Sequence, residues 1–108
     1  MDTSRYKVII TPTAFKEINK IYNYITEELH AENAAKALMK KIEKEVQMLK
    51  YAPKIHKQIK KVDELKRTYK RIVINNYILL YTIYEDEKLI FVSHMYYGGS
   101  NYMNNYFL

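Results

Sequence analysis

Residues 69–84 follow the two-residue period of β-strands, with Ile, Val, Tyr and Thr dominating two arms around Asn75-Asn76. Asparagine tolerates the left-handed backbone that a type I′ hairpin turn requires. The pattern therefore predicts a β-hairpin whose second arm, apolar on both faces, lies inside a sheet. The pairs expected across it are Ile74–Tyr77, Ile72–Leu79, Arg71–Leu80 and Tyr69–Thr82.

Residues 11–53 show the three- and four-residue spacing of amphipathic helices instead. Thr11 or Thr13 is a candidate cap for a first helix that has Pro12 in its first turn. The break at His30–Asn33 offers Asn33 as the cap of a second helix, which ends near Pro53. We expect these helices to pack as an antiparallel pair. Their apolar stripes are Ala14, Ile18, Ile21, Tyr22, Ile25 and Leu29, then Ala35, Leu38, Ile42, Val46 and Leu49.

The remaining segments complete a single α+β domain over residues 1–108 with the order β-α-α-β-β-β. Residues 5–10 form an opening strand, residues 54–64 a basic loop with a short edge strand, and residues 89–97 a last strand. Residues 100–108 are expected to form one or two helical turns. The helical hairpin packs on one face of a small twisted antiparallel sheet. Its opposite face, here called the open face, carries Tyr69, Arg71, Val73, Ile78 and Leu80.

Charge adds a possible partner to this picture. The chain carries a net charge of +6, and residues 36–71 hold thirteen Lys or Arg against four Asp or Glu. Such a stretch attracts a polyanion or an acidic protein, although a solvated helix face explains many lysines equally well. There is no cysteine, membrane-length apolar run or signal-peptide core, so we expect a cytoplasmic protein.

The order of these segments resembles the RelE/ParE superfamily of bacterial toxins from type II toxin–antitoxin modules, which stabilise plasmids among other roles. The resemblance is carried by the opening strand into Thr11-Pro12-Thr13-Ala14, by Ile21–Ile25, by Leu49–Pro53 and by the 69–81 hairpin. It implies a toxin that is neutralised by an antitoxin encoded beside it. RelE-like members cleave mRNA on the ribosome, whereas ParE-like members poison DNA gyrase.

The hairpin is more similar to the ParE-like form. Arg71 matches one basic position of the RelE-like pattern, and Asn76 to Tyr81 match the ParE-like sequence well. Cleavage of RNA needs several cations around the phosphate and a group that transfers protons. The further cations of the RelE-like pattern fall here on Tyr69, on Ile78 (or Tyr77 in related nucleases) and on Gly98-Gly99.

Arg71 and Tyr97 are the catalytic candidates if the protein is a ribonuclease. A two-residue turn within residues 85–88 would place Tyr97 on the open face beside Arg71, and a one-residue change of register would hide it. The same register turns His94 toward the helices, where a buried histidine with a satisfied partner is expected. His30 and His56 lie in separate loops, so no metal site or cofactor is predicted.

Three functions follow: a ParE-like gyrase inhibitor acting by protein binding, a RelE-like mRNA endoribonuclease, or an inactive relic that only binds antitoxin. The missing arginines favour the first or third. In each case we expect the acidic C-terminal segment of an antitoxin to cross the helix pair and sheet edge. Operator DNA is expected to be bound by the antitoxin and not by the toxin directly. No membrane partner is expected. Partner or nucleic-acid contacts are predicted at Tyr69, Arg71, Ile78, Leu80, Lys60, Lys61, Lys66 and Arg67.

Overall fold

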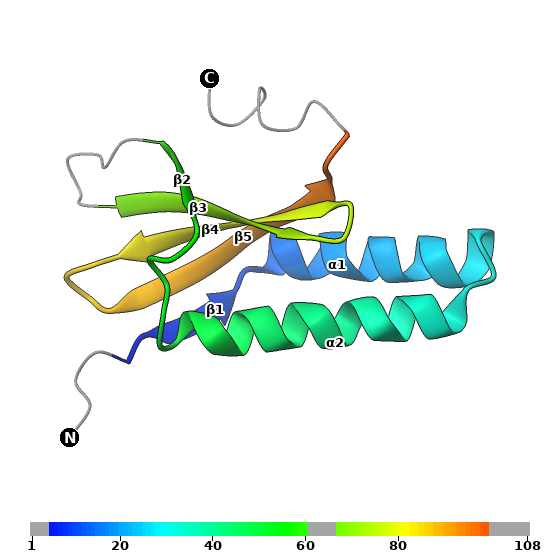
Figure 1. The fold of residues 1–108 in the computed structure, drawn as a ribbon, viewed down its shortest axis with the longest axis horizontal. Coiled ribbons are helices and arrows are strands. Elements are labelled where there is room, and N and C mark those ends of the chain that lie inside the picture. Colours follow the sequence, from blue (N-terminus) through cyan, green and yellow to red (C-terminus); the bar gives the residue numbers. More distant parts are fainter. Residues whose placement is uncertain (1–4, 61–66, 100–108) are drawn as a thin grey trace.

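The computed structural model describes residues 5–60 and 67–99 and contains a helical pair packed on one face of a five-stranded sheet (Figure 1). The predicted α+β fold is confirmed. The expected helical turns of residues 100–108 lie outside the described residues. In chain order the elements are β1 (Lys7–Ile10), α1 (Pro12–Asn23), the π-helix η1 (Tyr24–Glu28), α2 (Glu32–Leu49), β2 (Lys57–Lys60), β3 (Arg67–Ile74), β4 (Tyr77–Tyr84) and β5 (Leu89–Tyr97).

The sheet has the strand order β1-β5-β4-β3-β2. Strands β2 to β5 are antiparallel, as expected, but the sheet is mixed because β5 returns in the same direction as β1 and pairs with it in parallel. All four residue pairs predicted across the β3–β4 hairpin are present. Of the two turn residues, Asn75 has a positive φ, 54°, and Asn76 does not, so the connection is not the type I′ turn that we predicted.

The two α-helices begin in different ways, and only the first has a side-chain cap. Thr11 caps α1 by accepting a hydrogen bond from the Ala14 N–H at 3.1 Å, with Pro12 at the first helical position. The prediction that Asn33 caps the second helix is wrong. Helix α2 already begins at Glu32 with Ala31 at the N-cap position, directly after His30, which has a left-handed φ of 49°. The π-helix η1, which widens the end of the first helix, was not predicted.

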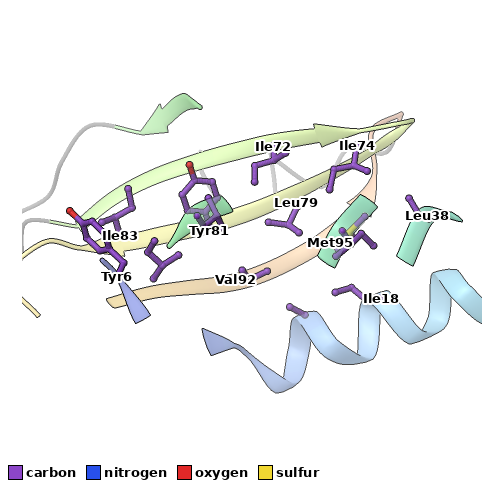
Figure 2. Close-up of a cluster of buried hydrophobic side chains, with 14 of the residues drawn as sticks. Tyr6, Ile18, Leu38, Ile72, Ile74, Leu79, Tyr81, Ile83, Val92 and Met95 are labelled. Carbon is purple, nitrogen blue, oxygen red and sulfur yellow. The ribbon is translucent and has the colours of Figure 1, made fainter. Parts of the chain in front are cut away.

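The main core lies between the helical pair and the sheet (Figure 2). Leu79 and Ile83 of β4 are fully buried, and Ile90 and Val92 of β5 lie beside them. Both predicted helical stripes contribute, since Ile18 and Leu38 reach the sheet from α1 and α2. The hydrophobic pattern therefore predicted correctly which face of the sheet the helical pair covers.

A β-bulge near Ser93 reverses the phase of β5. Leu80 pairs with His94 but the adjacent Tyr81 pairs with Val92, so Ser93 is the extra residue. The Ser93 hydroxyl donates a hydrogen bond to the Leu80 carbonyl at 3.3 Å, which helps to hold the bulge. After it, the side chains that an unbroken strand would point to the open face point to the helices instead.

The loop before β2 is held by two buried side chains of the sheet. The Tyr81 hydroxyl donates to the Pro53 carbonyl at 2.5 Å, and the Lys70 ammonium donates to the Lys54 and His56 carbonyls at 3.1 and 2.7 Å. Burial lowers the pKa of Lys70, and burial likewise raises that of Tyr81. These bonds fix the point at which β2 begins.

Candidate functional site

The open face carries a pair of cations on neighbouring strands. Lys57 of β2 lies directly opposite Arg71 of β3, so their side chains share this face. No carboxylate forms an ion pair with Arg71 within residues 5–60 and 67–99. Two adjacent cations with no acidic partner among the described residues form a surface that attracts anions.

Tyr96, and not Tyr97, is the tyrosine beside Arg71. Burial raises the pKa of the Tyr96 phenol, while the neighbouring Arg71 guanidinium acts in the opposite direction. Two members of the site, Lys57 and Tyr96, were not predicted. Lys57 was hidden because its segment lacks strand periodicity, and Tyr96 because the bulge reverses the phase of β5.

The other predicted contacts have mixed outcomes. Tyr69 lies on this face with the Arg67 guanidinium carbon 5.8 Å from its ring centroid. Lys60 lies at the end of β2, where its side chain is not described, and Lys61 and Lys66 fall outside the described residues. The grouping of Lys57, Arg67, Tyr69, Arg71 and Tyr96 is here called the basic patch. It joins the predicted residues Arg67, Tyr69 and Arg71 with two that were not predicted.

The apolar residues of the open face are less accessible than we predicted. Ile78 is 9% exposed and Leu80 only 1%, so these two predicted contact residues are buried. They form a second small core with Tyr96, and Ile59 of β2 packs against it. Val73 alone stays exposed, at 62%. Burial leaves Ile78 and Leu80 as supports of this face and not as contacts.

Tyr97 lies away from Arg71, which corrects the predicted pairing. It is opposite Tyr77, whose ring packs against the helix-side core, and the two ring centroids are 6.0 Å apart in an edge-to-face arrangement. Tyr97 therefore cannot share a phosphate with Arg71 in this register. The bulge at Ser93 is the physical reason.

Tyr97 instead lines an open groove of about 720 Å³ between the first helix and the turn end of the sheet. Tyr24 and Leu29 line it as well and are 53% and 54% exposed. The prediction that Leu29 belongs to the buried stripe of the first helix is therefore wrong. Tyr24 is the first residue of the π-helix η1, and Leu29 directly follows its last residue. We call this surface the α1 groove; it is lined by Glu17, Lys20, Ile21, Tyr24, Leu29, Asn76, Tyr77, Met95 and Tyr97.

His94 contacts the first helix, as predicted, although it pairs with Leu80 of the open face because the bulge at Ser93 reverses the phase of β5. Its Nδ1 lies 3.2 Å from Oε1 of Glu17, and the same carboxylate oxygen accepts a hydrogen bond from the Met95 N–H at 3.0 Å. The imidazole therefore has a carboxylate partner that α1 supplies. No group of three or more potential metal ligands occurs within residues 5–60 and 67–99. Among the described helices, none is long and apolar enough to cross a membrane.

Comparison with solved structures finds the same fold in two toxin–antitoxin complexes. A chain of the archaeal RelE–RelB complex from Pyrococcus horikoshii OT3 is 17% identical with a TM-score of 0.65, covering 88% of this chain and 97% of that one. A chain of the chromosomal ParDE system from P. aeruginosa is 11% identical with a TM-score of 0.67, covering 88% and 98%. No curated protein sequence matches this chain.

The sequence itself supplies the family. Residues 8–102 match the family described as ParE toxin of type II toxin–antitoxin system, parDE. The match covers both helices, the basic patch and the α1 groove. It also covers every described strand, apart from the first residue of β1. The chain belongs to the ParE toxin family of type II toxin–antitoxin systems.

Proposed function

We propose that this toxin acts in the cytoplasm by binding a protein target, with DNA gyrase expected from its resemblance to ParE-like toxins, and not by cutting RNA. The observation that supports this most is the composition of the open face. Of the described residues, only Arg71 and Lys57 bring cations to its centre, beside a buried apolar cluster of Ile78, Leu80 and Tyr96. Transfer of a phosphodiester needs both charge stabilisation and a proton-transfer group.

The possible proton-transfer groups are poorly arranged for that reaction. His94 pairs with Leu80 of the open face, but its imidazole is held by Glu17 of α1, and Tyr97 packs against Tyr77 on the helix side. Tyr96 does lie beside Arg71, but burial raises the pKa of its phenol and disfavours the phenolate. A ribonuclease using Arg71 and Tyr96 is the second candidate, because their proximity on one face is the feature that would serve it.

An antitoxin is expected to neutralise the toxin through the α1 groove. The groove gathers exposed apolar side chains of Tyr24, Leu29 and Tyr97, and large exposed apolar groups on a soluble domain mark protein interfaces. Both similar structures are of toxin–antitoxin systems. An apolar segment of the antitoxin is the occupant that suits this lining.

The proposal predicts that the purified protein inhibits supercoiling of relaxed plasmid by gyrase. Because the antitoxin would compete for toxin surface, prior addition of the product of the neighbouring gene should restore supercoiling at equimolar ratio. The assay follows topoisomers on agarose gels, with gyrase alone and gyrase plus neighbouring-gene product as controls. Undiminished supercoiling at toxin concentrations far above those of gyrase would count against gyrase as the target.

A further inference from the structure

The open face of the sheet carries cations of several strands and no carboxylate. Residues that pair across neighbouring strands share a face, so the register assigns each paired residue to one side of the sheet. Among the paired strand positions of the described chain, none on the open face is Asp or Glu. The cations that the register places there include Lys7, Lys57, Arg67 and Arg71.

The acidic residues of the described chain lie in other parts of the fold. They lie on the helices or at positions 85–87, in the turn between β4 and β5. Glu85 is already bound, since its Oε1 lies 3.2 Å from the Lys54 ammonium and accepts a hydrogen bond from the Tyr6 hydroxyl at 3.0 Å. Helices α1 and α2 both pack on the other face of the sheet (Figure 1). The two faces therefore differ in charge, and the open face is the one that attracts anions.

Lys57 and Arg71 are held opposite each other at the centre of this face. The buried Lys70 fixes the chain just before Lys57, because its ammonium donates to the Lys54 and His56 carbonyls at 3.1 and 2.7 Å. Arg67 lies on the same strand as Arg71 and four residues before it. At the rise of a β-strand this separation is about 13 Å, which corresponds to about four base-pair steps of B-DNA. The cations are thus spaced so that they can contact different phosphates of one duplex.

The aromatic rings of the open face already pack against other protein groups. Tyr96 is buried in the second small core, and the ring centroids of Tyr84 and Phe91 lie 5.1 Å apart in an edge-to-face arrangement. The Arg67 guanidinium lies over the Tyr69 ring. Binding of single strands relies on rings on which unpaired bases can stack. A face with fixed cations and occupied rings is better suited to a duplex, whose bases are already stacked and whose phosphates lie outside.

We propose that the basic patch, centred on Lys57 and Arg71, binds the phosphate backbone of double-stranded DNA without regard to sequence. Phosphate contacts position a protein on DNA but do not read bases, so this binding differs from recognition of an operator. It would concentrate the toxin on the DNA substrate of gyrase, but the inference does not depend on gyrase being the target.

Fluorescence anisotropy of a short labelled DNA duplex, titrated with the full-length toxin over a range of salt concentrations, tests the proposal. The double variant Lys57→Gln/Arg71→Gln should bind about tenfold more weakly or worse. It should also reduce the slope of log affinity against log salt concentration by about two, because each lost phosphate contact releases about one counterion fewer.

A matched pair controls for net charge. The variant Lys16→Gln/Lys40→Gln removes the same charge from exposed positions of α1 and α2, and its affinity for the duplex should fall by less than about threefold. Melting temperatures of all variants report folding. The single variant Lys57→Gln changes only an exposed side chain, so it keeps the test valid if the double variant does not fold. It should bind about threefold more weakly than the wild type and reduce the salt slope by about one.

Three results would overturn the proposal. Equal weakening by the two folded double variants would assign the attraction to the net charge of +6 and not to the basic patch. Tighter binding of single-stranded RNA or DNA of the same length than of the duplex would make the open face a single-strand site. Absence of duplex binding at low salt would remove the DNA-binding role while leaving the supercoiling test of the proposed function unaffected.

Discussion

Replacing Leu79 with alanine is expected to lower the free energy of unfolding by about 3 kcal/mol, the middle of the range for a buried leucine. Leu79 is fully buried at the centre of the sheet, between Ile72 on β3 and Met95 on β5, and faces the helical pair (Figure 2). Its neighbours belong to several elements, so they cannot all move to fill the space. Urea unfolding followed by circular dichroism gives the measurement.

Val73→Ala provides the matched control on the opposite face of the sheet. Val73 is 62% exposed, so its truncation should change the free energy of unfolding by less than about 0.5 kcal/mol. Similar losses in the two variants would mean that the core does not lie between the helices and the sheet.

Replacing Tyr24 with alanine should weaken antitoxin binding by about 30-fold, equivalent to about 2 kcal/mol, if the α1 groove is the main contact. Tyr24 lines the groove and is 53% exposed, so it is available to be buried by a partner. Aromatic side chains at the centre of an interface commonly contribute this much. Isothermal titration calorimetry with the neighbouring-gene product measures the change.

Ile55→Ala is the control for that measurement. Ile55 is 67% exposed and does not line the α1 groove, so its loss should leave affinity within a factor of about three. Both variants should unfold close to the wild-type temperature, since neither side chain is buried. An affinity unchanged by Tyr24→Ala would place the antitoxin elsewhere on the toxin.

The β3–β4 hairpin could be predicted in detail because its signals are local. Alternation fixed the faces, and the two asparagines fixed the turn, so the position of Arg71 on the open face followed from sequence. The helical stripes were equally local. The turn type was not predictable, because asparagine is compatible with several left-handed turns and only Asn75 has a positive φ.

The rest of the site depended on contacts between distant residues. Neither glycine nor proline marks the bulge at Ser93, yet that one residue exchanges Tyr96 for Tyr97 beside Arg71. The burial of Leu80 likewise depends on a second small core assembled from β2, β4 and β5. A period-two pattern reports which residues share a face, but not which later segments cover that face.

Mapping the 5′ ends of abundant transcripts after induction of the toxin tests most directly the claim that it acts by binding and not by cutting RNA. The expected result is a pattern of ends identical to that of uninduced cells, in the wild type and in Arg71→Ala alike. Cuts that are phased with codons, appear on induction of the wild type and vanish in Arg71→Ala would contradict the claim and establish the basic patch as a ribonuclease site.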